Sequence, residues 1–182
     1  MVSSILPLTV VTSDQLPIPG IEPWFADPRD PALSVMTDFR ERASITVSDT
    51  ATIDAAMEHM RHTGVRCAFA IDAPMRVVLG LITAYDIVGE KPMQYALCRS
   101  MRRCEVLVRD IMLDISCCGV IDIKQIERAT VAAVANMFTA NRLTHVPVIE
   151  TRDNGEQRLR GLLSAAKVRR LLRGSSAAAT EA

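Results

Sequence analysis

The feature that most constrains this 182-residue chain is that its sequence repeats itself once. Five short blocks recur in the same order, and chance similarity between apolar segments would not keep one order through five blocks. The chain is therefore expected to fold as two similar units. The paired blocks are Val35–Phe39 with Ile111–Ile115, Ile45–Val47 with Ile121–Ile123, Thr52–Met60 with Thr130–Phe138, Ala70–Asp72 with Val148–Glu150, and Gly80–Thr83 with Gly161–Ser164.

Each repeat predicts the element order strand, helix, strand, strand, helix. A short strand at Ile45–Val47 precedes Thr52, which can cap a helix whose apolar residues recur at spacings of three and four. The second copy begins its helix at Thr130. Gly64 and Asn141 are expected to end the two helices, because both residue types tolerate left-handed backbone angles. A unit of about 60 residues buries too little surface alone, so we expect an α/β (α+β) fold in which two pseudo-symmetric repeats pack sheet to sheet.

Distinct segments flank the repeats. Six of the nine prolines lie in the first 31 residues, which predicts an extended N-terminal arm. This arm carries Trp24 and Phe25, which we expect to pack on the body of the protein or on a partner subunit. The last nine residues are small and polar and are expected to be disordered. The expected division into arm, first repeat, second repeat with a basic connector, and tail is 1–34, 35–98, 99–173 and 174–182.

Composition narrows the classes of function. Lys plus Arg equals Asp plus Glu, at 21 each, which argues against nucleic acid or an anionic membrane as the main partner. Five cysteines without a CxxC pair argue against a disulfide framework or a zinc site and favour a reducing, cytoplasmic location. No signal peptide, membrane-spanning run or familiar catalytic motif is evident. We therefore expect a cytoplasmic protein that is not an enzyme and holds no metal.

Three segments carry a resemblance to a known family: Gly80–Asp86, Val108–Met112 and Asn141–Val148. Together, and in this order, they resemble the CBS domain family, which is named after cystathionine beta-synthase. The resemblance extends from Val35 to Leu172 and implies a tandem CBS pair, or Bateman module. In that family two clefts between the sheets often bind AMP, ADP, ATP or S-adenosylmethionine, and the pairs usually dimerise.

The resemblance also implies a ribose site at Thr83 and Asp86. A carboxylate can accept hydrogen bonds from both hydroxyls of a ribose diol, and free amides at a helix start can meet a phosphate. The same two residues also predict a capping box, which would stabilise the helix without any ligand. The ligand-binding residues that the resemblance implies are Val65, Arg66, Phe69, Thr83, Ala84, Tyr85, Asp86, His145, Pro147, Ser164 and Lys167.

Two departures from the family pattern bear on these clefts. Phe69 stands where the family often has proline, as the second repeat has at Pro147, and it can either narrow the cleft or stack on an adenine. Lys167 stands where the ribose carboxylate is expected in the second repeat. We therefore expect at most one ordinary nucleoside site, in the first repeat's cleft. Lys167 is expected to face an anion, such as Glu150 or a nucleotide phosphate, or to extend into solvent.

Two functions remain open at this point. The first is a regulatory, ligand-sensing module that binds an adenine nucleotide, needs no obligatory cofactor and acts on a protein that the sequence does not identify. The second is a structural or protein-interaction module whose clefts are vestigial. In either case a homodimer is expected through the apolar stripes of the two long helices, at Met57, Met60, Val134 and Phe138.

Overall fold

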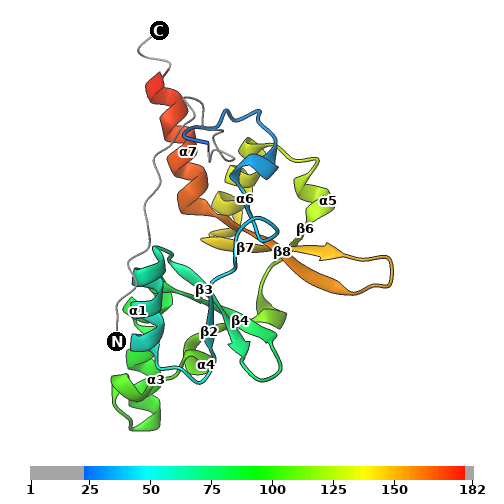
Figure 1. Cartoon of the computed structure of the whole chain (residues 1–182). Helices are drawn as coiled ribbons and strands as arrows, with labels where there is room; N and C mark the ends of the chain where they lie inside the picture. The colour runs from blue at the N-terminus through cyan, green and yellow to red at the C-terminus, as the bar shows by residue number, and fades with distance from the viewer. Residues whose placement is uncertain (1–22, 179–182) are drawn as a thin grey trace, which may run out of the picture.

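The computed structural model describes residues 23–178, and the side chains of residues 23–173. Two halves lie one above the other in Figure 1, each built on a four-stranded sheet, which confirms the expected α/β fold of two repeats. The first half contains β2 (Thr46–Ser48), α1 (Ile53–Thr63), β3 (Cys67–Asp72), β4 (Val77–Thr83), α2 (Ala84–Val88) and α3 (Lys91–Arg99). The second contains β6 (Ile121–Asp122), α5 (Ile123–Ile126), α6 (Val131–Asn141), β7 (His145–Thr151), β8 (Gln157–Ser164) and α7 (Ala165–Ala178).

A short leading segment precedes each repeat and joins the sheet of the other half. The first includes η1 (Ala32–Val35) and β1 (Thr37–Asp38); the second includes η2 (Arg103–Glu105), α4 (Val108–Ile111) and β5 (Leu113–Asp114), followed by η3 (Ile115–Cys117). Strand β1 pairs with β8, and β5 pairs with β4, both antiparallel. The sheet orders are therefore β2-β3-β4-β5 and β1-β8-β7-β6, and each sheet takes one edge strand, β5 or β1, from the leading segment of the other repeat.

The expected helix starts are confirmed. The hydroxyl oxygens of Thr52 and Thr130 accept hydrogen bonds from the amides of Ala55 and Ala133, at 3.2 and 3.3 Å. Gly64 ends α1 in the left-handed conformation, as expected. The expectation for Asn141 is wrong by one residue: Asn141 is the last residue of α6, and the left-handed position falls on Arg142, with φ of 53°.

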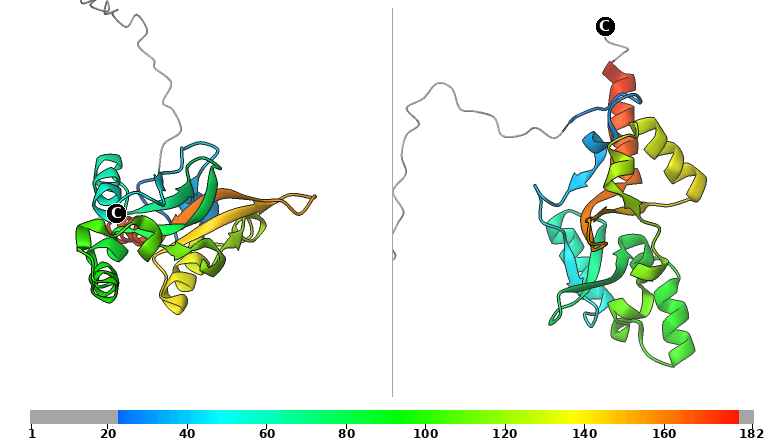
Figure 2. Two further views of the ribbon diagram at one scale, coloured as in Figure 1. Left: turned by 90° about the horizontal axis from the view of Figure 1, so that it is seen from below. Right: turned by 90° about the vertical axis from the view of Figure 1, so that its right-hand side faces the viewer.

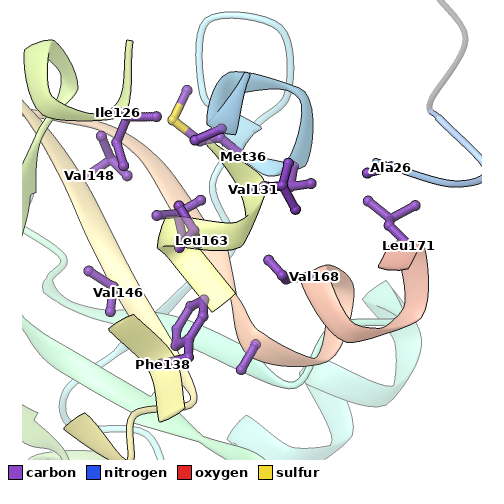
Figure 3. Close-up of a cluster of buried hydrophobic side chains, with 14 of the residues drawn as sticks. Ala26, Met36, Ile126, Val131, Phe138, Val146, Val148, Leu163, Val168 and Leu171 are labelled. Atoms are coloured by element: carbon purple, nitrogen blue, oxygen red, sulfur yellow. The ribbon is translucent and has the colours of Figure 1, made fainter. Parts of the chain in front are cut away.

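The exchange of leading segments extends to the hydrophobic cores. Ala26 and Met36 are buried in the core of the second half, beside Val131, Leu163 and Leu171 (Figure 3). In the right-hand view of Figure 2 this blue segment lies beside α7 of the second half, and the Ala26 amide donates to the Leu171 carbonyl at 3.1 Å. The core of the first half takes its matching residues from the second leading segment: Val106, Val108 and Ile111. The packing units therefore cut across the boundaries of the sequence repeats.

A third apolar cluster joins the two sheets. Phe69 and Leu81 of the first sheet pack with Leu159 and Leu162 of the second, and Phe39 lies against Phe69. Burial of these side chains between the sheets holds the halves together, since apolar surface removed from water stabilises the packing.

The structure also tests what was expected of the two terminal segments of the chain. Trp24 and Phe25 are 86% and 57% exposed, which does not fit the expected packing on the body of this chain; the alternative, packing on a partner subunit, stays a prediction. Helix α7 continues to Ala178, within the segment expected to lack regular structure. Residues 1–22 of the expected arm and 179–182 of the expected tail lie outside the described residues. None of the helices in the described part of the chain is both long and apolar enough to cross a membrane.

Candidate ligand-binding cavity

A cavity of about 590 Å³ lies where the two halves meet. Its walls come from the connection between β1 and β2, the turn between α1 and β3, the start of β7, and the junction of β8 with α7. The volume falls within the range of about 300–1,000 Å³ that is usual for small-molecule sites. Because both halves and an exchanged leading segment contribute walls, a bound ligand would contact all three.

The structure brings seven of the expected site residues to this cavity: Val65, Arg66, Phe69, Tyr85, His145, Ser164 and Lys167. Thr83, Ala84, Asp86 and Pro147 are not among its lining residues. Other lining residues were not predicted from the sequence. Among them are Thr37, Phe39 and Arg42 of the first leading segment, and Arg169 and Arg170 of α7. Arg170 could have been predicted as a site residue, because it lies three residues after Lys167 and therefore on the same face of the helix.

The charged residues that line this cavity all have one sign, and the Asp86 carboxylate lies close by without lining it. The lining residues belong to the described part of the chain, and none of them is Asp or Glu. The cationic lining residues are Arg42, Arg66, Lys167, Arg169 and Arg170. A hollow lined by one sign of charge attracts ligands of the opposite sign. The cavity is therefore suited to an anion.

Lys167 is one of these cations and is partly buried. It is the third residue of α7, and its Nζ donates to the Met36 carbonyl oxygen at 3.4 Å. The expected partner Glu150 is five residues along β7 from His145, near the far end of the β7–β8 hairpin, and forms an ion pair with Arg40 at 2.7 Å. Glu150 is therefore not the anion that faces Lys167.

His145 contributes polarity to the cavity without charge. Burial lowers the pKa of its imidazole to about 4, although the nearby Asp86 carboxylate acts in the opposite direction. At neutral pH the ring is therefore uncharged and can both donate and accept hydrogen bonds. Its Nδ1 lies 3.1 Å from the Thr144 hydroxyl oxygen.

Aromatic side chains form another part of the wall. The rings of Phe39 and Phe69 meet edge to face, with centroids 5.8 Å apart. Phe69 lines the cavity but is only 2% exposed, so its ring offers little surface for stacking on a ligand. Tyr85, which is 54% exposed, and Phe39 lie nearer to solvent.

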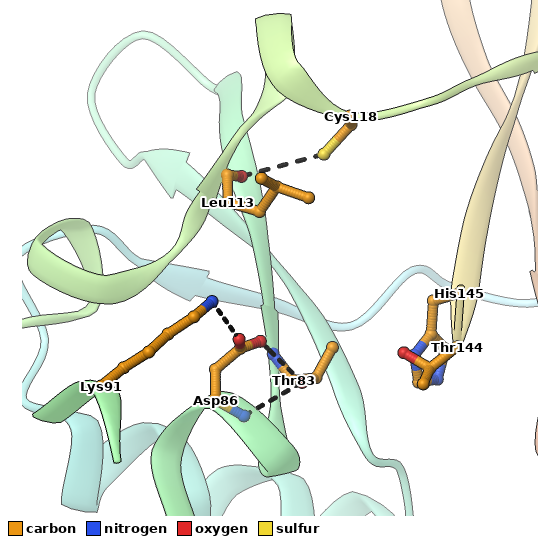
Figure 4. Close-up of polar contacts among 7 residues, drawn as sticks. All are labelled: Thr83, Asp86, Lys91, Leu113, Cys118, Thr144 and His145. Carbon is orange, nitrogen blue, oxygen red and sulfur yellow. Dashed lines mark hydrogen bonds and ion pairs between the residues drawn. The ribbon is translucent and has the colours of Figure 1, made fainter. Parts of the chain in front are cut away.

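Asp86 is held by contacts with its own surroundings (Figure 4). Its Oδ2 accepts from the Thr83 amide at 3.0 Å and from the Thr83 hydroxyl at 2.6 Å, while Oδ1 pairs with Lys91. The predicted capping box is therefore confirmed. Burial acts to raise the pKa of Asp86, but the hydrogen bonds from Lys91 and Thr83 outweigh it and hold this pKa below its ordinary value. A ribose diol would have to displace Lys91 to use this carboxylate fully.

Nucleophilic or metal chemistry finds little support at the cavity. Cys67 lines it, but burial raises the pKa of this thiol to about 12, so the reactive thiolate is scarce at neutral pH. Among the described residues, no group of three or more His, Cys, Asp or Glu side chains is placed to hold a metal ion. What the cavity can do is bind a small anion by charge, hydrogen bonding and aromatic contact.

Comparison with known proteins agrees with the fold of two paired repeats. The CBS domain family matches residues 32–92 and 127–174. CBSX2 from Arabidopsis thaliana has a similar structure at 17% identity, with a TM-score of 0.52 over 85% of this chain and 99% of that one. The CBS domain pair of protein MJ0100, at 18% identity, has a TM-score of 0.54 over 81% of this chain and 99% of that one. The CBS-domain protein ATU1752 from Agrobacterium tumefaciens, at 20% identity, has a TM-score of 0.53 over 75% and 93%. No curated protein matches the chain significantly by sequence.

Proposed function

This chain belongs to the CBS domain family, and on that premise we propose that it is a regulatory module that binds an adenine nucleotide in the cavity between its repeats. The observation that carries the proposal is the cavity of about 590 Å³, walled by both halves and supplied with aromatic and cationic side chains. Two structural neighbours support the adenine class. CBSX2 has been solved in complex with AMP, and the MJ0100 pair with 5′-methylthioadenosine and S-adenosylmethionine.

The same walls suggest how binding acts as a signal. Thr37 and Arg42 reach the cavity from the first leading segment, whereas Arg66 belongs to the first half and Lys167 to the second. A ligand that prefers one arrangement of these walls shifts the chain toward that arrangement. A regulated protein that contacts either half would sense the shift, so the chain needs no chemistry of its own.

Isothermal titration calorimetry with AMP, ADP, ATP and S-adenosylmethionine tests the proposal. Ala166→Trp places a bulky ring at an exposed position on the cavity wall, and Ala140→Trp places the same ring on the exposed end of α6. We expect at least one adenine compound to bind the wild type and the Ala140→Trp control, and Ala166→Trp to weaken it by about tenfold or more. Binding that is equal in both variants would place the ligand elsewhere.

The alternative is a structural or protein-interaction module, and one surface favours it. Tyr85 and Val88 of α2, and Met93 and Leu97 of α3, are each at least 54% exposed. Clusters of exposed apolar side chains often mark a protein interface. If none of the four adenine compounds binds the wild type, this alternative holds.

We also propose a cytoplasmic homodimer, although not through the apolar stripes expected from the sequence. Met60, Val134 and Phe138 are buried in the cores of this chain itself, which leaves the α2 and α3 surface as the better candidate interface. All five cysteines are free thiols, as suits a reducing compartment. Analytical ultracentrifugation checks the assembly: Leu97→Asp should convert a dimer to a monomer, and a wild type that sediments as a monomer at micromolar concentration would contradict it.

A further inference from the structure

We infer that the cavity selects a nucleoside polyphosphate and holds its phosphate groups at Lys167 and the neighbouring arginines of α7. This inference rests on the proposed function and deepens it by naming the class of ligand and the direction in which it lies. Neutral nucleosides and the cationic sulfonium of S-adenosylmethionine are then poor ligands for this cavity.

The charged side chains that line the cavity are all cationic. Five cationic side chains from three separate segments line the cavity, and none of its described lining residues is acidic. The ring of His145 is neutral at physiological pH and leaves that balance unchanged. A monophosphate satisfies few of these donors, while a chain of phosphates offers enough anionic oxygen for several of them. A sulfonium compound adds a positive charge to a site that is already positive.

Three of the five cations that line the cavity lie on α7. Lys167 and Arg170 are one turn apart on α7, and both line the cavity. Lys167 lies in the first turn of the helix, where the helix dipole favours a bound anion. The same positive end of the helix adds to the attraction for a phosphate, and Ser164, just before the helix, provides a hydroxyl donor.

Matching positions of the two repeats carry residues of opposite charge. Thr83 and Asp86 of the first repeat correspond to Ser164 and Lys167 of the second. A carboxylate accepts hydrogen bonds and suits the hydroxyls of a sugar, whereas an ammonium group only donates and suits an anionic oxygen. Asp86 is engaged with Thr83 and Lys91 and does not line the cavity. At Lys167 the cavity therefore recognises phosphate in place of a ribose diol.

A second cavity adjoins the first and differs from it in the charges of its lining residues. Thr37, Arg42 and Lys167 also border a cavity of about 400 Å³. That cavity is lined by carboxylates as well as cations, namely Asp38, Glu41 and Glu127. These carboxylates offset the cations of the smaller cavity, so the larger cavity, which no acidic residue lines, is the better site for an anionic ligand.

The test is calorimetric titration of ATP, ADP, AMP and adenosine into the wild type and three variants. Lys167→Met keeps the apolar stem of the side chain and removes only the charge, Lys167→Asp reverses the charge, and Lys124→Met removes a matched exposed lysine on α5, away from the cavity. We expect affinity to fall in the order ATP, ADP, AMP, adenosine. Lys167→Met should weaken ATP by about tenfold or more and leave adenosine unchanged. Lys167→Asp should weaken ATP further and strengthen adenosine, and Lys124→Met should match the wild type.

The outcomes separate this inference from the proposed function. If all four compounds bind the wild type equally, or Lys167→Met weakens ATP and adenosine to the same extent, the inference is overturned while nucleotide binding stands. If none of the four binds the wild type, the proposed function itself fails. Thermal melting of each unliganded variant verifies that it is folded before titration. At higher salt the preference for ATP over adenosine should shrink, because ionic screening weakens charge recognition.

Discussion

At the scale of single residues, burial sets what the polar groups of the cavity can do. His145 and Cys67 begin the matching strands β7 and β3, and both are held in their neutral forms by burial. Asp86 and Lys167 stand at matching positions of the two repeats, but only Lys167 lines the cavity. The two repeats thus carry residue types of opposite charge at the same structural position, and only the cationic one contributes to the cavity.

His145 should make stability depend on pH in the acid range. Its pKa is lowered from 6.5 to about 4 in the folded chain, so between these values the unfolded chain binds a proton that the folded chain does not. The free energy of unfolding should therefore fall as pH drops through this window, by at most about 1.4 kcal/mol per pH unit from this group. In His145→Asn this contribution is removed, and urea denaturation from neutral pH to about pH 5 should show a shallower loss. Parallel losses in the two proteins would show that His145 is not the buried titrating group.

At the scale of elements, the exchanged strands depend on two close approaches of the backbone. A Cβ atom on Gly80 would lie 2.5 Å from the Leu113 carbonyl oxygen, and one on Gly161 would lie 2.7 Å from the Thr37 carbonyl oxygen. These two glycines face β5 and β1, so each lets the leading segment of the other repeat approach its sheet.

Alanine at either glycine should therefore weaken the fold. We expect Gly80→Ala and Gly161→Ala each to lower the free energy of unfolding by about 1–3 kcal/mol, because backbone has to shift to admit the methyl group. Gly119→Ala is the matched control, since a Cβ there meets nothing within 4 Å, and its effect should stay within about 0.5 kcal/mol. Chemical denaturation measures all three. If Gly80→Ala and Gly161→Ala are as mild as the control, the strand exchange does not require these close approaches.

The order strand, helix, strand, strand, helix was predictable from the sequence, whereas the additional helices α3, α4 and α5 and the exchange of strands were not. Thr52 and Thr130 predict the starts of α1 and α6, because a capping side chain bonds to an amide within the next few residues. The pairing of Thr37 with Leu162 joins residues 125 positions apart, and no local pattern encodes it. For the same reason Phe39 and Arg42 were missed as cavity residues, while Ser164 and Lys167 were found from the repeat. The left-handed position at Arg142 shows the usual one-residue uncertainty of a helix end.

At the scale of the whole molecule, the exchange makes each half depend on the other. Val106 and Val108 complete the core of the first half, and Ala26 and Met36 that of the second. Neither core is complete without residues that precede the other repeat. The cluster around Phe69 and Leu162 then joins the two sheets directly.

Unfolding should therefore be a single cooperative transition. Differential scanning calorimetry is expected to give one peak, with the calorimetric enthalpy equal to the van't Hoff enthalpy. Two peaks, or a van't Hoff enthalpy near half the calorimetric value, would mean that the halves unfold independently. In that case a ligand could order one half without affecting the other.

The central claim, that an anionic nucleotide binds where the halves meet and engages both of them, is tested most directly by amide hydrogen exchange with and without ATP. The account predicts that ATP slows exchange in three segments together: residues 37–45 of the first leading segment, 64–69 of the first half and 162–170 of the second. Because these segments are far apart in the sequence, joint protection reports one shared site. Protection confined to residues around Asp86 and Lys91, or no protection at ATP concentrations that saturate binding, would contradict the account.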